Sequence, residues 1–176
     1  MKRINIKNTA LSALFLCIGL ILPLFTSQIK EIGDTLLPMH IPVMLCGFIC
    51  SYGYGFTVGL ILPFLRSFMF SMPPFYPNAV WMSAELAVYG LVTGLVYSFF
   101  KVKNLRATYI SLISAMLLGR VVWGITKAVL MAAGGKSFTL TLFIAGGFVD
   151  ALPGIILQLV IIPIIMILIN RRRVIK

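Results

Sequence analysis

Apolar residues fill six long stretches of the chain, and most of the polar residues lie between them. The stretches run over residues 9–27, 40–52, 55–72, 77–100, 106–133 and 138–169. A helix needs about 20 residues to cross a hydrocarbon core of about 30 Å, and most of the stretches are that long, although the second is shorter. The pattern therefore predicts an all-α integral membrane protein with six transmembrane helices.

Glycines mark two further features of this pattern. The sequence Ser51-Tyr52-Gly53-Tyr54-Gly55 follows the short second stretch and predicts a tight hairpin turn into the third. The pairs Gly55-x-x-x-Gly59 and Gly90-x-x-x-Gly94 permit close approach of helices, which we interpret as packing within the protein. No linker, low-complexity segment or repeat is visible, so we expect residues 1–176 to form a single membrane domain.

The composition agrees with this class of protein. Of the 176 residues, 60% are apolar and 11% are charged, and the mean hydropathy is +1.06. Soluble domains carry roughly 45–50% apolar and about 25% charged residues, so the chain lacks the polar surface that a soluble globule needs. Because six spans use nearly all of this length, there is no room for a soluble catalytic domain or a nucleotide-binding domain.

Basic residues are distributed unevenly between the connections. The chain has 15 Lys and Arg residues against 4 Asp and Glu residues. Three basic residues precede the first stretch, three lie between residues 100 and 107, and four follow residue 170, which makes ten on one side; Lys30 and Lys136 lie on the other. The positive-inside rule then places both termini in the cytoplasm and predicts a multi-pass protein of the cell membrane. This topology accounts for the basic excess without a nucleic-acid partner.

Ionisable residues also occur inside the predicted spans. They are Arg66, Glu85, Arg120, Lys127 and Asp150. A charge in the bilayer interior costs at least about 2.5–3.5 kcal/mol on the insertion scale, so such residues usually face a protein interior or an aqueous cavity and often mark function. The predicted topology places all five in the middle or outer half of the bilayer, and His40 joins them at the outer rim.

Helical spacing groups these residues with aromatic and small residues. Residues three or four positions apart share a helix face, so each of the last three predicted spans presents one polar stripe. The stripes are Asn78, Trp81, Glu85 and Tyr89 in the fourth span, Arg120, Trp123, Gly124 and Lys127 in the fifth, and Gly147, Asp150 and Gly154 in the sixth. Such stripes at similar depth predict an outward-facing pocket for a small molecule. We predict that the pocket is lined by His40, Arg66, Asn78, Trp81, Glu85, Tyr89, Arg120, Trp123, Lys127 and Asp150.

The charges within the predicted spans do not cancel. Three cations against two carboxylates leave one positive charge, which an anionic group on a ligand would balance, with Arg120 or Lys127 as its best partner. An alternative is a set of interhelical ion pairs that only hold the helices together. Such pairs would join Glu85 to Arg120, and Asp150 to Lys127 or Arg66.

Other residues of the predicted pocket also have two interpretations. Trp81, Trp123 and Tyr89 suit a wall around the ligand, but the two tryptophans fit a lipid-facing aromatic belt equally well. His40 fits a helix start at the rim as well as a ligand contact. The connection Met72-Pro73-Pro74-Phe75-Tyr76-Pro77 is stiff and aromatic, which suits either a gate over the pocket or a rigid turn at the membrane interface.

Four sequence segments carry a resemblance to a known family. They are Leu37-Pro38-Met39-His40-Ile41-Pro42-Val43-Met44-Leu45-Cys46-Gly47, Gly53-Tyr54-Gly55-Phe56-Thr57-Val58-Gly59-Leu60, Met72-Pro73-Pro74 and Glu85-Leu86-Ala87-Val88-Tyr89-Gly90. With them the chain resembles the substrate-binding S components of energy-coupling factor (ECF) vitamin transporters, over most of residues 1–170, and looks most like the pantothenate-type branch. The resemblance implies a six-span protein that binds a vitamin near the outer face. Pantothenate carries a carboxylate, which agrees with the positive surplus.

The resemblance also implies partner proteins. S components act with a transmembrane coupling subunit and two ATPase subunits, and the family's contact with the coupling subunit is Ala-x-x-x-Ala on the first span. In this chain Thr9, Ala10, Ala13 and Cys17 form an arc of small residues on that span, in which Ala13 alone matches as alanine at the expected spacing. The arc also fits a packing face within the protein.

The sequence argues against catalysis by this chain. A single His and scattered cysteines do not provide a zinc site, and there is no Gly-x-x-x-x-Gly-Lys-Ser/Thr loop for ATP, so we expect no metal, no cofactor and no enzymatic activity. The energy for uptake would then come from the partner subunits. The alternative function is a stand-alone secondary transporter that uses Glu85 or Asp150 for ion coupling.

Overall fold

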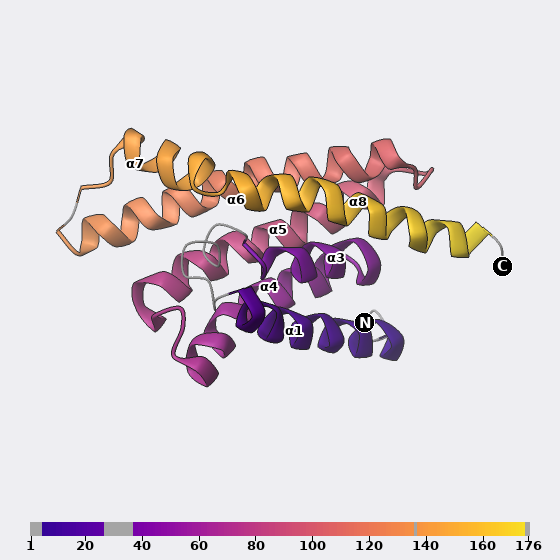
Figure 1. The fold of residues 1–176 in the computed structure, drawn as a ribbon, viewed down its shortest axis with the longest axis horizontal. Helices are drawn as coiled ribbons and strands as arrows, with labels where there is room; N and C mark the ends of the chain where they lie inside the picture. Colours follow the sequence, from indigo (N-terminus) through magenta and orange to yellow (C-terminus); the bar gives the residue numbers. More distant parts are fainter. Residues whose placement is uncertain (1–4, 27–36, 136, 175–176) are drawn as a thin grey trace.

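The computed structural model describes residues 5–26, 37–135 and 137–174, and the regular structure in these ranges is helical (Figure 1). The elements are α1 (Ile6–Thr26), α3 (His40–Cys50), α4 (Tyr52–Phe70), the π-helical turn η1 (Phe75–Ala79), α5 (Val80–Phe99), α6 (Leu105–Ala133), α7 (Leu140–Ile144), the π-helical turn η2 (Ala145–Val149) and α8 (Leu152–Val174). Helical stretches long and apolar enough to cross a membrane are Ile6–Phe25, Tyr52–Phe70, Phe75–Phe99, Leu105–Ala133 and Leu140–Asn170. The prediction of an all-helical protein with several membrane-length helices is therefore confirmed.

The helix α3 differs from the other predicted spans, because it has only 11 residues. At 1.5 Å per residue it is roughly 16 Å long, which is about half of a hydrocarbon core. Nearly all of its residues are buried, as expected of a helix in the middle of a core. The predicted tight turn is confirmed only at Ser51, which alone joins α3 to α4, because the other four residues of the predicted turn already belong to α4. The count of six membrane crossings stays a prediction.

The start of α1 and the end of α8 lie at the same end of the molecule (Figure 1). This arrangement agrees with an even number of crossings. Several residues that entered the charge count lie outside the described residues, namely Lys2, Arg3, Lys30, Lys136 and Lys176. The placement of both termini in the cytoplasm stays a prediction.

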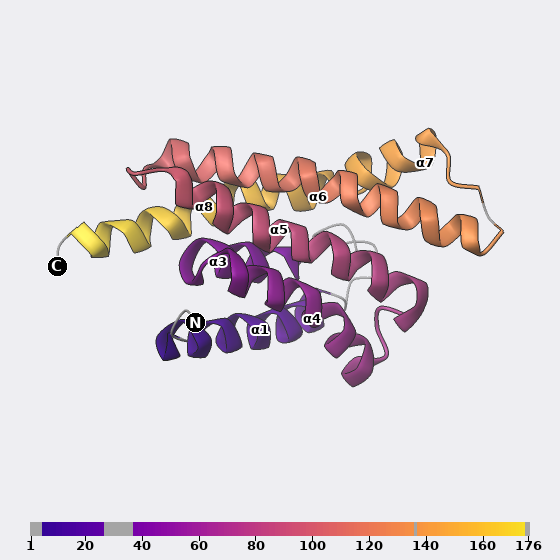
Figure 2. The ribbon, with the colours of Figure 1, turned by 180° about the vertical axis from the view of Figure 1, so that it is seen from behind.

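The helix α5 is the centre of the bundle. It packs against α3 and α4 on one side and against α6 on the other, and α1 packs against α3 and α4. The helix α8 runs alongside α6, as both views of the ribbon show (Figures 1 and 2). The chain thus forms two groups of helices, α1 with α3 and α4, and α6 with α8, and α5 joins them.

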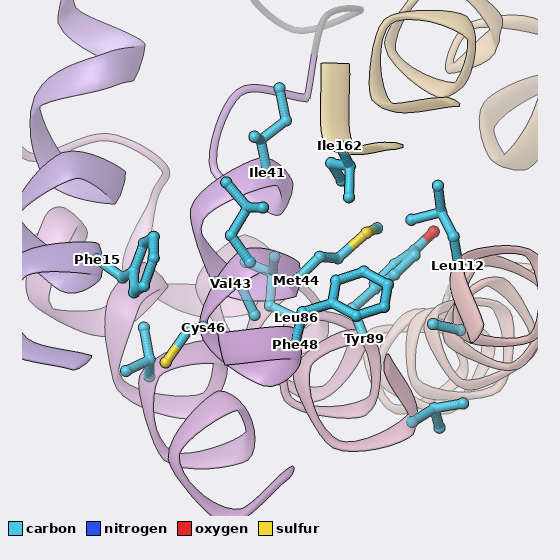
Figure 3. Packing of buried hydrophobic residues seen from close by; sticks show 14 of the residues in the cluster. Phe15, Ile41, Val43, Met44, Cys46, Phe48, Leu86, Tyr89, Leu112 and Ile162 are labelled. Carbon is cyan, nitrogen blue, oxygen red and sulfur yellow. The ribbon is translucent and has the colours of Figure 1, made fainter. Parts of the chain in front are cut away.

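Buried apolar side chains from six helices meet in one core, part of which Figure 3 shows. Phe15 of α1 faces α3, and Met44 of α3 lies beside Tyr89 of α5 (Figure 3). Ile162 of α8 and Leu112 of α6 close the core on the other side. None of these five side chains is more than 9% exposed. The core holds α3 in place and so fixes the position of its first residue, His40.

Glycines let α3, α4 and α5 approach one another at backbone distance. A Cβ atom on Gly90 of α5 would lie 2.2 Å from the Gly55 carbonyl oxygen of α4, and one on Gly47 of α3 would lie 2.5 Å from the Gly90 carbonyl oxygen. A Cβ atom on Gly59 would lie 2.3 Å from the Leu86 carbonyl oxygen. These distances are too short for any larger residue, so the predicted packing role of the glycines is confirmed. The contacts fix the height of α4 against α5.

The last predicted span is interrupted. The pattern predicts one helix there, whereas the structure has α7, η2 and α8. Pro153 accounts for the break, because it lacks the N–H that would bond the Val149 carbonyl and its ring would clash with that carbonyl. Asp150 lies in the turn before α8 and is exposed, whereas Gly147 and Gly154 are buried. The predicted stripe of these three residues is therefore wrong.

We expect Gly90→Ala to destabilise the protein by about 1–3 kcal/mol, because the added methyl group must push α5 away from α4. Thermal unfolding of the detergent-purified protein measures the loss. Gly53→Ala is the matched control, since a Cβ atom there has no neighbour within 4 Å and alanine favours a helix over glycine by roughly 1 kcal/mol. Equal melting temperatures for the wild type and Gly90→Ala would contradict the close approach.

Candidate functional site

A cavity of about 390 Å³ lies between α3, α4, α5 and α6. Its volume is within the range of roughly 300–1,000 Å³ that is common for small-molecule sites. Eight of the ten predicted pocket residues line it: His40, Arg66, Asn78, Trp81, Glu85, Arg120, Trp123 and Lys127. Because Arg66 and Lys127 come late in α4 and α6, and Glu85 early in α5, the cavity lies toward the end of the bundle that is opposite the start of α1.

Glu85 is the acidic centre of this cavity. Its Oε1 lies 3.0 Å from Nη1 of Arg120 and 3.5 Å from Nε2 of His40. Each of the three side chains is at most 4% exposed. The cluster joins α3, α5 and α6, so the predicted ion pair between Glu85 and Arg120 is confirmed. Within the described ranges, no group of three His, Cys, Asp or Glu residues is placed to hold a metal ion.

Several polar atoms of this cluster have no hydrogen-bond partner in the part of the chain that the structure describes. They are Nε and Nη2 of Arg120 and both ring nitrogens of His40. A buried donor without a partner costs roughly 1–3 kcal/mol, so native proteins usually supply one. The ion pair with Glu85 therefore leaves part of the Arg120 guanidinium available to another polar group.

Lys127 lies against aromatic rings instead of a carboxylate. Its Nζ is 4.5 Å from the centre of the Trp123 ring, 5.2 Å from that of Trp81 and 5.8 Å from that of Phe138. Attraction to the ring faces offsets part of the cost of desolvation but leaves the charge uncancelled. Trp123 is 7% exposed and lines the cavity, so its alternative placement in a lipid-facing belt is wrong.

Arg66 is a second cation of the cavity without a carboxylate partner among the described residues. Its Nη1 donates a hydrogen bond of 3.0 Å to the Leu20 carbonyl oxygen of α1. Its guanidinium carbon lies 5.7 Å from the centre of the Phe70 ring. The side chain is 6% exposed. Arg66 therefore ties α1 to α4 through a neutral acceptor and keeps its full charge.

Tyr89 is a predicted pocket residue that the structure places in the core. It is 1% exposed, and its ring meets the His40 ring edge to face at 4.9 Å between centroids. Gly119 of α6 lies directly against the tyrosine ring, where a Cβ atom would come within 2.6 Å of it. Tyr89 thus packs behind His40 (Figure 3 shows its place in the core).

Asp150 is the second predicted residue that does not line the cavity. It is exposed in the turn before α8, and it forms no ion pair with Lys127 or Arg66, although the structure describes all three residues. The predicted ion pair of Asp150 is therefore not formed, although Asp150 lies near enough to Lys127 to act on its charge over a longer distance. Among the described residues, three lining cations now face one lining carboxylate, Glu85, so these lining side chains carry a surplus of two positive charges rather than one.

The sequence pattern also missed residues that surround the cavity. Met82 and Gly146 line it, and Phe138 reaches Lys127 from the connection between α6 and α7. Met82 and Gly146 each lie one position from a residue of a predicted stripe, so the helical spacing contained a weak signal for them. Phe138 precedes α7, where helical spacing has no signal.

The first half of the proline-rich connection before α5 lines the cavity. Residues 72–74 line the cavity. Phe75 and Tyr76 are each 61% exposed. The first three residues therefore form part of the wall, which agrees with the interpretation of this segment as a cover for the pocket.

The arc of small residues on α1 faces away from the bundle. Thr9, Ala10, Ala13 and Cys17 are all exposed, whereas Ser12, Phe15 and Gly19 on the other side of α1 are buried. The Thr9 Oγ1 lies 3.3 Å from the Tyr54 hydroxyl oxygen, within hydrogen-bond distance. The alternative of a packing face within the protein is therefore wrong for Ala10, Ala13 and Cys17.

These features define a multi-pass membrane protein with a charged cavity between its helices. The family model for the ECF transporter, substrate-specific component, matches residues 7–166. The chain therefore belongs to the family of ECF transporter substrate-specific components. A comparison with curated proteins gives no match. Membership makes the chain a membrane subunit that binds the substrate in vitamin-type uptake and acts with ECF coupling and ATPase subunits, and a transporter subunit rather than an enzyme.

We expect Glu85→Gln to destabilise the protein by about 3–5 kcal/mol, because it leaves the buried Arg120 charge without its counter-charge. The double variant Glu85→Gln/Arg120→Gln should lose less than the two single variants together, since neither charge then remains alone. Thermal unfolding in detergent measures this coupling. Asp150→Asn, at an exposed carboxylate, is the control and should change stability little. Additive losses would show that the two residues are not coupled.

Proposed function

We propose that this chain captures an anionic vitamin or a related small molecule in the cavity, and that it passes this molecule to separate coupling and ATPase subunits for uptake. Pantothenate, the substrate that the sequence resemblance indicates, is the first candidate. The observation that carries the proposal is the charge around the cavity, where three cations face one carboxylate in the part of the chain that the structure describes. Holding a cation away from water without a close counter-charge is costly, and an anionic ligand would supply that counter-charge to the buried Arg66 or the half-buried Lys127.

The position of the cavity supports capture from outside the cell. The start of α1 and the end of α8 lie together (Figure 1), and the cavity lies toward the other end of the bundle. If the basic termini are cytoplasmic, as the positive-inside rule predicts, the cavity is in the outer half of the membrane. A vitamin would then enter it from the exterior.

The lining side chains suggest a division of roles. Arg120 and Lys127 of α6 offer charged donors to the anionic group, and Trp81 and Trp123 form an aromatic wall beside it. Glu85 holds Arg120 in place. Arg66 of α4, Asn78 of η1 and His40 of α3 supply further polar groups to the cavity. Asp150 is not part of this proposal because it lies outside the cavity.

The proposal is tested first by identifying the molecule that copurifies with the protein in detergent, using mass spectrometry. We expect an anionic vitamin or a close relative. Arg120→Gln or Lys127→Gln should weaken its binding by about 1 kcal/mol or more, measured by titration calorimetry. Lys101→Gln, in the exposed connection between α5 and α6, is the control and should bind normally. Unchanged affinity in both cavity variants would contradict the role of the two cations.

We further propose that the exposed arc of Thr9, Ala10, Ala13 and Cys17 contacts the coupling subunit, because small residues on an outward face let another helix approach closely. Ala13→Leu should leave substrate binding unchanged and reduce both copurification with the coupling subunit and uptake. Ala132→Leu, at another exposed alanine near the end of α6, is the control. Loss of substrate binding in Ala13→Leu would mean that the arc serves folding instead.

A stand-alone secondary transporter is the second candidate, because Glu85 is a buried carboxylate in contact with His40 and is placed where a proton carrier would need to be. Vesicles that contain this chain alone distinguish the two functions. We expect binding without net uptake, and uptake only when the coupling and ATPase subunits and ATP are added. Gradient-driven uptake by the chain alone would favour the secondary transporter.

A further inference from the structure

Two lining cations, Lys127 and Arg66, form no ion pair with a described carboxylate, and they belong to different walls of the cavity. Among the described lining residues Glu85 is the one carboxylate, and its Oε1 lies 3.0 Å from Nη1 of Arg120. Lys127 projects from α6 and Arg66 from α4, and α5 packs between these two helices. The positive surplus is therefore divided between two places instead of being concentrated in one.

Among the described residues, neither cation forms an ion pair with a carboxylate, and Asp150 and Glu85 act on Lys127 only over a longer distance. Lys127 has the three aromatic rings around its Nζ, and these attract the cation without neutralising it. Arg66 has the Leu20 carbonyl oxygen, which is a neutral acceptor. Arg66 is buried and Lys127 is half-buried, so holding either charge without a close counter-charge is costly, and a single anionic group beside one wall would relieve only one of the two.

We propose that the molecule bound in the cavity is a dianion with two separated anionic groups, one beside Lys127 on the α6 wall and one beside Arg66 on the α4 wall. This inference rests on the proposed function and narrows its substrate class. Pantothenate, with one carboxylate, would satisfy one wall. A relative with a second carboxylate or a phosphate at its other end would satisfy both. The cavity of about 390 Å³ admits a molecule of that size.

The test compares ligands that differ by one anionic group. The pairs are pantothenate with 4′-phosphopantothenate and nicotinate with pyridine-2,5-dicarboxylate, and binding to the detergent-purified protein is measured by titration calorimetry. We expect the member with two anionic groups to bind at least about tenfold more tightly in at least one pair, since a charged hydrogen bond at a buried site typically contributes this much. The inference would be overturned if the ligand with two anionic groups bound equally or more weakly in both pairs. It would also be overturned if none of the four ligands bound.

Variants assign the two groups to the two walls. Arg66→Gln keeps a hydrogen-bond donor for the Leu20 carbonyl but removes the charge, so it should remove most of the affinity advantage of the two-group ligand. Arg66→Lys keeps the charge and should keep this advantage. Lys127→Gln should weaken both members of the pair. An advantage that survives in Arg66→Gln would overturn the assignment to the α4 wall. If Arg66→Gln fails to fold, the ligand pairs measured on the wild type still test the preference for two anionic groups. The comparison of the wild type with Arg66→Lys then tests the role of the α4 wall.

One further control concerns Glu31 and Asp34, which lie outside the described residues. The variant Glu31→Gln/Asp34→Asn should show the same preference as the wild type. A stronger preference in this variant would mean that one of these acids already balances a cavity cation, which would overturn the count of two.

The outcomes also distinguish this inference from the proposed function. Tight binding of pantothenate with no gain in affinity from the second anionic group in either pair supports the proposed function and overturns the inference of a dianion. A dianion preference without pantothenate binding supports the inference and rejects that candidate substrate.

Discussion

A guanidinium buried among membrane helices needs a counter-charge, and the arrangement of this protein depends on how Glu85 supplies it to Arg120. The 3.0 Å contact joins α5 to α6, and the 3.5 Å contact with His40 brings in α3. Because the pair is enclosed, either charge alone would cost several kcal/mol. The contact thus fixes two polar side chains in the lining of the cavity. It also pairs the one carboxylate among the described lining residues with Arg120, so that Lys127 and Arg66 have no ion pair with a described residue.

The helices that carry these groups are held in position by close backbone packing. Gly55 and Gly59 of α4 and Gly90 of α5 place the two helices in contact, and α3 is enclosed by the core. Such packing leaves little freedom for α5 to slide along α4. The polar side chains therefore occupy fixed positions in a cavity whose lining is largely preformed. This is the condition under which charged donors bind a ligand without a large cost for ordering them.

Much of this architecture follows from the sequence, because hydropathy and helical spacing are strong signals in membrane proteins. Charged residues inside apolar spans are costly and therefore indicate a polar site, and four of the residues chosen on this basis line the cavity: Arg66, Glu85, Arg120 and Lys127. The prediction for Asp150 was wrong because helical spacing holds only along a regular α-helix, whereas the π-helical turn η2 precedes Asp150 and α8 begins only at Leu152.

Two other features required three-dimensional packing to resolve. Tyr89 shares the stripe of Glu85, but Gly119 admits its ring into the core, and no pattern on α5 alone carries that information. Phe138 reaches Lys127 from a connection, beyond the reach of helical periodicity. The exposure of Ala13 likewise depends on which side of α1 meets α3 and α4.

The central claim is that an anionic ligand completes the charge balance of the cavity, and an experimental structure of the protein with its copurified ligand tests it most directly. The account predicts an anionic group within about 4 Å of the Lys127 ammonium, the distance of an ordinary ion pair, with Glu85 still bound to Arg120. A neutral or cationic ligand in the cavity, or an anion bound elsewhere while Lys127 pairs with a carboxylate of the protein, would contradict the account.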